Sequence, residues 1–149
     1  MNESMNESLG KWVSIIHRYC RSYIDKEFAG LDIKGGYLQF IHALYRHDGL
    51  SQDELSEALG MDKTTTARAI KELVELGYVI KEHDSHDKRF YRLSLTNKSK
   101  AIIPGLEKIL KHWTEVLAAG FTQDERQFAV DILKKMAENA AEFKKRGFS

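Results

Sequence analysis

The sequence predicts a mainly α fold with a small β-wing, in which a winged helix-turn-helix lobe is combined with helices from the two chain ends. Two short amphipathic segments meet at a tight turn around Gly60. Two strand-like runs follow, and apolar residues recur at helical spacing on both sides of this region. The 149 residues fit one domain, 1–149, with the winged lobe at about 34–96 and helices that we assign to dimerisation at about 9–30 and 97–146.

Two helices are predicted before the turn. Between Leu9 and about Phe28, apolar residues recur at steps of three and four, which indicates a helix with one wide apolar stripe, and Gly30 fits its end. A second helix is predicted from about Lys34 to Arg46. Its start is the less defined end, because Gly35 and Gly36 are poor helix formers.

The turn contains residues that start and stop helices. Ser51 and Glu54 are spaced as a capping box, in which the hydroxyl and the carboxylate satisfy exposed backbone amides, so a short helix is predicted to begin here. Gly60 suits its end, and Asp62 is placed to cap the next helix. The inner face of the short helix would be formed by Leu55, Ala58 and Leu59. Two helices joined so tightly must cross at a large angle.

The next helix, Lys63 to Leu76, is predicted to have an apolar and a polar face. If each residue turns by about 100°, Arg68 lies at the centre of the exposed face. The apolar side would contain Ala67, Ile70, Leu73 and Val74, with Thr66 close to it. The exposed side would contain Thr64, Thr65, Arg68, Glu72 and Glu75, with Lys71 at the margin. Short polar and basic side chains on this side would let the helix approach a phosphate or a base edge.

Two strands and two long helices are predicted to follow. Tyr78–Ile80 and Phe90–Leu95 would form strands around an almost entirely polar loop. Inward alternation is expected at Tyr91, Leu93 and Leu95. Thr96 would cap a long helix that contains Pro104, and Thr122–Glu125 form a second capping box before the last helix. One small lobe cannot cover the apolar stripes of the first and the last two helices, so a homodimer with a mostly helical interface is predicted.

This pattern resembles the MarR family of transcriptional regulators over most of the length of the chain. The matching residues are Leu55–Thr66 (LSEALGMDKTTT), Arg68, Leu73, Leu76–Val79, and Asp87-Lys88-Arg89 followed by Leu93–Thr96. The resemblance implies a ligand-responsive repressor, a homodimer that binds a pseudo-palindromic operator in double-stranded DNA in a sequence-specific way.

The resemblance places the DNA-binding surface on the second helix of the turn and on the wing. Arg89 would be the wing-tip arginine that enters a minor groove, and Asp87 would hold the wing in shape by pairing with an arginine. Lys88 stands where many relatives have arginine, and lysine lacks the bidentate fork. The DNA-binding residues implied in this way are Lys63, Thr64, Thr65, Arg68, Lys71, Lys88 and Arg89.

The resemblance also implies a crevice for a small aromatic or phenolic effector between the dimerisation helices and the winged lobe. Such a ligand needs aromatic walls and cationic or imidazole donors. The candidates are His17, Arg18, Arg21, Tyr37 and Phe40. For each of them the alternative is an ordinary core or surface position. Cys20 does not clearly coincide with the peroxide-sensing cysteine of the family, so no redox switch is implied.

The sequence predicts no enzyme, no cofactor and no metal site. It contains no glycine-rich phosphate loop and no nucleophile elbow, and its six histidines lack the compact spacing of a zinc motif. No apolar run approaches the roughly 18 to 20 residues of a membrane span, and the first residues lack a signal-peptide pattern. We therefore expect a cytoplasmic protein.

Net charge does not identify a DNA-binding surface in this chain. The formal charge is +1 overall, and between Ser51 and Thr96 seven basic and nine acidic residues give −2. Binding must therefore depend on where the charges lie, with weak nonspecific affinity and a strong salt response. The negative balance leaves a second hypothesis open, a winged-helix protein-interaction module that does not bind DNA.

Overall fold

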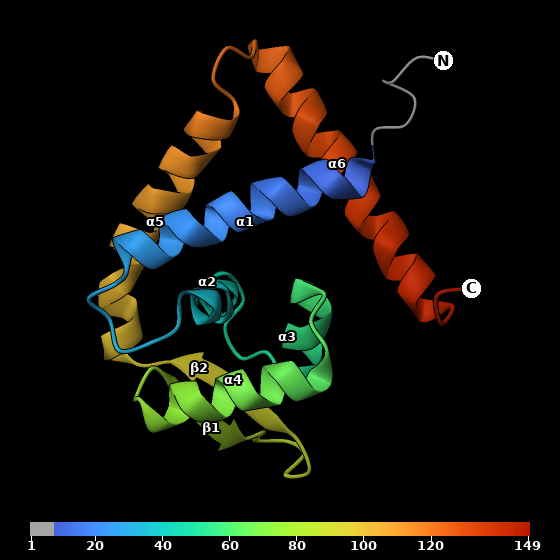
Figure 1. Cartoon of the computed structure of the whole chain (residues 1–149). Coiled ribbons are helices and arrows are strands. Elements are labelled where there is room, and N and C mark those ends of the chain that lie inside the picture. Colours follow the sequence, from blue (N-terminus) through green and yellow to red (C-terminus); the bar gives the residue numbers. More distant parts are fainter. Residues whose placement is uncertain (1–7) are drawn as a thin grey trace. The chain divides into compact units, whose positions relative to one another are not determined.

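The computed structural model describes residues 8–149 and confirms a mainly α fold with a small β-wing (Figure 1). In chain order the elements are α1 (Leu9–Glu27), the 3-10 helix η2 (Gly35–Tyr37), α2 (Leu38–Arg46), α3 (Gln52–Leu59), α4 (Lys63–Glu75), β1 (Val79–His83), β2 (Tyr91–Leu95), α5 (Asn97–Leu117) and α6 (Gln123–Lys145). The chain divides into two compact units between Ile109 and Leu110, and the winged lobe belongs to the first. No helix among the described residues is long and apolar enough to cross a membrane.

The core of the first unit lies where α2, α3, α4 and the hairpin of β1 and β2 meet. Its largest fully buried apolar side chains are Leu38, Phe40, Ile41, Leu44, Leu55, Ile70, Leu73, Tyr78, Leu93 and Leu106. Burying each such side chain contributes roughly 1.5 to 3 kcal/mol of transfer free energy. This core fixes α4 alongside the hairpin, so the two predicted DNA-binding elements have one common support (Figure 1).

The helix predicted from Lys34 is wrong at its start, because α2 begins at Leu38 and the preceding turn is the 3-10 helix η2. Gly35 and Gly36 are poor α-helix formers, and side chains of α1 lie against them. A Cβ atom on Gly35 would overlap the Asp25 carboxylate, and one on Gly36 would overlap the Arg21 guanidinium. The two glycines therefore lie in the 3-10 turn before α2, where they leave room for side chains of α1.

The helix-turn-helix is confirmed, but part of each predicted inner face is wrong. In α3, Leu55 is buried, whereas Ala58 is exposed and Ser56 is buried. In α4 the buried residues are Thr66, Ala69, Ile70 and Leu73, and the predicted inward positions Ala67 and Val74 are exposed. The buried set is itself spaced by three and four residues, so the period was right and its phase was rotated toward Ala69.

Thr66 faces inward, as its helical angle predicted. Its hydroxyl donates to the backbone oxygen of Asp62 at 3.0 Å, which satisfies the buried polar group.

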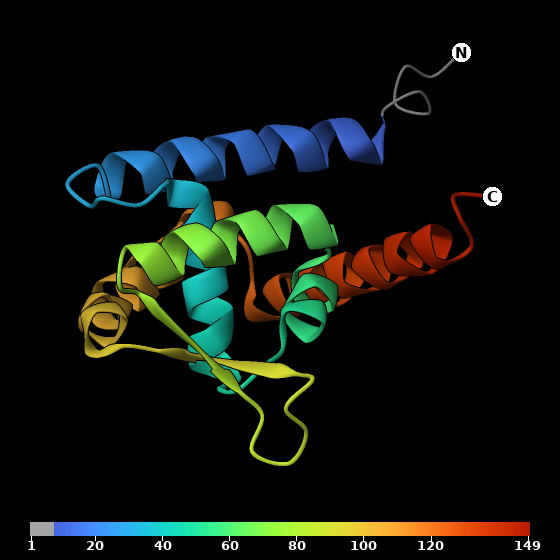
Figure 2. The same cartoon turned by 90° about the horizontal axis from the view of Figure 1, so that it is seen from below.

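The wing is an antiparallel pair in which Val79 lies opposite Leu95, Lys81 opposite Leu93, and His83 opposite Tyr91. Leu93 and Leu95 are buried as predicted, but Tyr91 is exposed, since it lies next to the loop that joins the two strands. β1 also continues to His83, three residues past the predicted end. The loop between the strands projects away from the helices of the lobe (Figure 2).

The corner between α4 and β1 is tied to the segment that follows α1. The Tyr78 hydroxyl donates to the Asp32 carboxylate, and Lys98 Nζ lies 3.1 Å from Asp32 Oδ2 and 2.8 Å from the Leu76 carbonyl oxygen. Burial and the Asp32 carboxylate raise the pKa of Tyr78 to about 12. These contacts hold the C-terminal end of α4 in place.

The second unit contains the end of α5 and all of α6. α6 begins with the predicted capping box, in which the Thr122 hydroxyl and the Glu125 carboxylate each accept a backbone N–H. No residue of α6 is buried, although Phe128 is 68% exposed and Ile132 37% exposed. Large apolar side chains therefore remain uncovered in a helix that the sequence predicted to pack.

Candidate nucleic-acid interface

The reading helix α4 begins at a tight cap. Asp62 Oδ1 accepts the Thr65 backbone N–H at 2.7 Å, and the Thr65 hydroxyl donates to Asp62 Oδ2 at 2.7 Å. The Thr65 hydroxyl is therefore already bonded to Asp62, so an external partner would meet the Thr65 methyl group. The side chains of Thr64, Arg68 and Lys71 are exposed and make no hydrogen bond or ion pair with a described residue. Their donors are available to an external partner.

Lys63 also lies at the start of α4, and its ammonium is 3.5 Å from the Asp53 carboxylate of α3. Both side chains are largely exposed, and such surface ion pairs contribute little to stability. A phosphate could therefore replace Asp53 at small cost.

The wing loop is organised by Asp84, a residue that the sequence analysis did not select. Asp84 Oδ1 accepts the backbone N–H of His86 at 2.7 Å and that of Asp87 at 3.0 Å. Asp84 Oδ2 accepts from Arg92 Nε at 2.7 Å, and the Asp84 side chain is only 13% exposed. The Arg92 guanidinium and then the two amides hold the pKa of Asp84 at about 2.

The role of Asp84 in the loop could have been predicted from the sequence. An aspartate whose carboxylate accepts the amides two and three residues further along forms an Asx-turn, and Asp-Ser-His-Asp is a suitable sequence for one.

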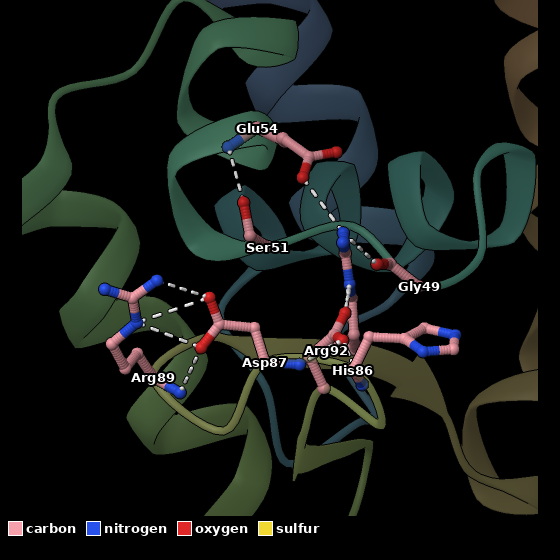
Figure 3. A network of polar contacts seen from close by, with 8 residues as sticks. Gly49, Ser51, Glu54, His86, Asp87, Arg89 and Arg92 are labelled. Atoms are coloured by element: carbon pink, nitrogen blue, oxygen red, sulfur yellow. Dashed lines mark hydrogen bonds and ion pairs between the residues drawn. The ribbon is translucent and has the colours of Figure 1, made fainter.

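Asp87 does pair with an arginine, and that arginine is Arg89 itself (Figure 3). Asp87 Oδ1 lies 3.0 Å from Arg89 Nε and Oδ2 lies 2.8 Å from Nη2, which is a two-point contact. The Arg89 backbone N–H also donates to Asp87 Oδ1 at 3.1 Å. The pairing lowers the pKa of Asp87 and raises that of Arg89. The Arg89 side chain stays 84% exposed, so Asp87 orients a guanidinium that solvent and DNA can reach.

Arg92 connects the wing to the helix-turn-helix. Its Nε binds Asp84, and its Nη1 lies 3.0 Å from Glu54 Oε1 and 3.3 Å from the Gly49 carbonyl oxygen (Figure 3). The capping box predicted at Ser51 is therefore only half formed. The Ser51 hydroxyl accepts the Glu54 backbone N–H at 3.1 Å, but the Glu54 carboxylate binds Arg92.

The remaining wing residues divide into structural and exposed ones. The His83 Nδ1 atom lies 2.7 Å from the Lys88 carbonyl oxygen, and the His83 ring stacks on Tyr91 at 4.3 Å. The Lys81 ammonium lies over the Tyr91 ring, 4.6 Å from its centroid. The Lys88 side chain is exposed and donates no hydrogen bond to a described residue. A groove of about 470 Å³ separates the wing from the first turn of α3, and Arg89, Phe90 and Arg92 line its wing side.

The effector candidates are placed differently from one another. Phe40 is 1% exposed and packs edge-to-face on Tyr37 with ring centroids 6.1 Å apart. Arg21 approaches the Gly36 backbone and lies 4.0 Å from Asp25. His17 and Arg18 are exposed on α1. For Phe40 the ordinary core position is therefore the simpler interpretation, and an effector role for the five stays a prediction.

The pKa of Asp84 gives a prediction for acid stability. A carboxyl with a pKa of about 2 in the folded protein, against an ordinary 3.8, stabilises the fold fully above that ordinary value and loses this contribution as the pH falls toward 2. We expect Asp84→Asn to lower the urea midpoint at pH 6, with the difference from the parent shrinking between about pH 4 and pH 2. Asp48→Asn, at an exposed position, is the control. A difference that does not change with pH would contradict the assigned contacts.

A lobe of this form, with a capped reading helix beside a two-stranded wing, defines a winged helix-turn-helix transcriptional regulator. Comparison with known proteins identifies the family. A model of the MarR family matches residues 31–89. The HTH-type transcriptional regulator YybA of Bacillus subtilis, itself uncharacterized, is 33% identical over 91% of this chain and 89% of its own length. The chain belongs to the MarR family, which confirms the resemblance and the class of transcriptional regulator predicted from the sequence.

Solved structures agree with this assignment. A MarR transcriptional regulator from Methanosarcina mazei Go1 is 40% identical, covers 91% of this chain and 97% of its own, and superposes with a TM-score of 0.81. A MarR family regulator from Listeria monocytogenes, solved in complex with 26mer DNA, is 28% identical, covers 95% and 96%, and has a TM-score of 0.89.

Proposed function

We propose that this protein is a homodimeric repressor that binds a pseudo-palindromic operator in double-stranded DNA and is released from it by a small effector. The observation that carries the proposal is that one lobe presents two exposed cationic side chains, one on α4 and one on the wing. Arg68 stands unpartnered at the centre of the exposed side of α4, and Arg89 is held out from the wing by Asp87. The Listeria monocytogenes relative, solved with 26mer DNA, supports the proposal through its similar fold.

In the proposed complex α4 lies in the major groove. Arg68 has a planar fork that matches the O6 and N7 atoms of guanine, and Thr64 is short enough to let the backbone approach. Lys63 and Lys71 lie nearer phosphates, and the Thr65 methyl group faces the bases. Arg89 and Lys88 reach the flanking minor groove from the wing. These positions account for binding by a lobe whose formal charge is negative, since the cations are exposed where the duplex arrives.

The dimer is proposed from apolar side chains that a single chain leaves exposed. On α1 these are Leu9, Trp12, Val13, Ile16 and Tyr19. From the end of α5 through α6 they are Val116, Leu117, Phe121, Phe128, Val130, Ile132, Leu133 and Phe143. Apolar surface of this extent at both chain ends is best explained by a second copy. A twofold axis then presents two reading helices about 34 to 36 Å apart, the spacing of successive major grooves.

The effector is proposed to be a small aromatic or phenolic acid that meets the cationic side of α1, where Arg18 and Arg21 lie. It would relieve repression by binding more tightly to a form whose two lobes no longer match the half-sites. Since the proposed partner is promoter DNA, the site of action is the cytoplasm.

Selection of bound duplexes from genomic fragments tests the function and names the operator. We expect enrichment of a pseudo-palindrome by the parent. Arg68→Ala should change the preferred base at one position of each half-site and weaken cognate binding by roughly 1 to 3 kcal/mol per contact. Arg46→Ala, at an exposed arginine of α2, is the matched control and should leave both unchanged.

If the parent enriches no duplex, the protein-interaction module becomes the favoured function. The negative charge of the lobe is the feature that supports that alternative.

A further inference from the structure

Arg92 stands out among the basic residues of the wing because two of its three side-chain nitrogens already donate to oxygens of the protein. Its Nε and Nη1 atoms bind three oxygens, from Asp84 in the loop, Glu54 in α3 and Gly49 before α3 (Figure 3). Two carboxylates thus neutralise one guanidinium, and the arginine side chain is only 47% exposed. A cation in this state attracts a phosphate weakly compared with Arg89, whose single acidic partner leaves it 84% exposed.

The position of Arg92 is where the wing would otherwise lose its support. At the base of the hairpin Leu93 is buried, and its backbone donates to the Leu50 oxygen at 2.9 Å and accepts from the Gly49 N–H at 3.0 Å. From Arg92 outward the residues of β2 and the loop are mostly exposed, and an isolated two-stranded hairpin is marginally stable in water. Lys81 Nζ also donates to Gln52 Oε1 of α3 at 3.1 Å, one ladder position nearer the base of the hairpin. Among the described residues the side chain of Arg92 therefore makes the outermost contact between the wing and α3.

A continuous series of contacts leads from Arg92 to Arg89. Arg92 binds the Asp84 carboxylate, which accepts the Asp87 backbone N–H at 3.0 Å. The Asp87 carboxylate then holds the Arg89 guanidinium at 2.8 to 3.3 Å. Each link fixes the direction of the next, so the place of the wing-tip guanidinium relative to α3 depends on Arg92.

We propose that Arg92 is a positioning residue that fixes the wing against α3 through Asp84 and Glu54, and that it sets the place of Arg89 on DNA without contacting DNA itself. The inference rests on the proposed DNA-binding function. The proposal assigns Asp84 and Glu54 to the same positioning network as Arg92, although both are anionic and would not attract DNA.

A double-mutant cycle tests the proposal. Arg92→Gln and Arg89→Ala are combined, and the operator affinity of the four proteins is measured by fluorescence anisotropy over a salt series. We expect Arg92→Gln to weaken binding about tenfold in the parent but less than about twofold when Arg89 is already alanine, because residues in one network are coupled. The salt slope should fall in Arg92→Gln by no more than it falls in Arg89→Ala, and Arg92→Gln should not change it when Arg89 is already alanine. Equal losses of affinity in both backgrounds, together with a further fall of the salt slope when Arg89 is already alanine, would mean that Arg92 contacts the duplex and would overturn the proposal.

Further variants separate positioning from general stability. Asp84→Asn should reproduce the loss and the dependence on Arg89, and Glu54→Gln, which cuts only the link to α3, should give a smaller loss of the same kind. Hydroxyl-radical footprints should lose protection in the flanking minor grooves and keep it in the major grooves read by α4. If Arg92→Gln does not fold, Glu54→Gln decides, and full affinity in that variant counts against the proposal. A parent that binds no duplex refutes the proposed function instead.

Discussion

Ile132→Glu on α6 is expected to convert the protein to monomers and to reduce operator binding by at least about 100-fold, the advantage that two linked reading heads have over one. Ile132 is 37% exposed on a helix without a buried residue, and its neighbours on the same side are Phe128, Met136 and Phe143. In a twofold interface each substitution occurs twice, and every buried carboxylate without a partner costs several kcal/mol. Sedimentation velocity at micromolar concentration and fluorescence anisotropy measure the two effects.

Lys134→Glu is the control for this substitution. It introduces the same residue in the same helix, but two positions further on and about 200° around the helix axis. It should remain a dimer and bind the operator. A parent protein that is a folded monomer, or an Ile132→Glu protein that still sediments as a dimer, would remove α6 from the interface.

Arg89→Ala is expected to weaken binding to every duplex, by about thirtyfold or more for the two wings of a dimer at roughly 1 kcal/mol each, and to lower the salt slope. The physical reason is the loss of a guanidinium that Asp87 already orients, so that little side-chain entropy is lost when it meets DNA. The effect differs from that of Arg68→Ala, which should alter the preferred sequence. Anisotropy titrations on cognate and scrambled duplexes distinguish the two.

Arg89→Lys sharpens the test of the wing. Lysine keeps the charge but lacks the planar fork, so it should restore most of the salt slope and only part of the affinity. Arg46→Ala should behave as the parent. Equal affinity of Arg89→Ala and the parent over the whole salt series would show that the wing tip does not reach the duplex.

The order of elements was predictable because helix starts and apolar periods are local signals. Asp62 and Thr122 each cap a helix where the sequence placed one. The errors arose where tertiary contacts decide. Ala67 was expected inward and is exposed, since alanine fits either environment and only the packing partners choose the phase. The start of α2 follows Gly35 and Gly36, whose weak helix preference was a local signal, whereas the side chains of α1 that lie against these glycines left no local pattern.

The candidate site was predictable to the same extent. Arg68 followed from helical geometry, and Arg89 with Asp87 followed from the family resemblance. Asp84 could have been recognised from its Asx-turn spacing. The contact between Arg92 and Glu54 could not, because it joins residues 38 positions apart and replaces a capping interaction that the local sequence favours.

The two glycines of η2 have a mechanical consequence. The Asp25 carboxylate and the Arg21 guanidinium lie where a Cβ atom on Gly35 or Gly36 would be, so α1 and η2 approach each other more closely than other residues at these two positions would allow. Both groups are ends of side chains that can rotate, so these contacts favour one position of α1 on η2 and do not lock it. In the proposed dimer a change in how two copies of α1 meet would therefore reach η2 and, through η2 and α2, the lobe that carries α4.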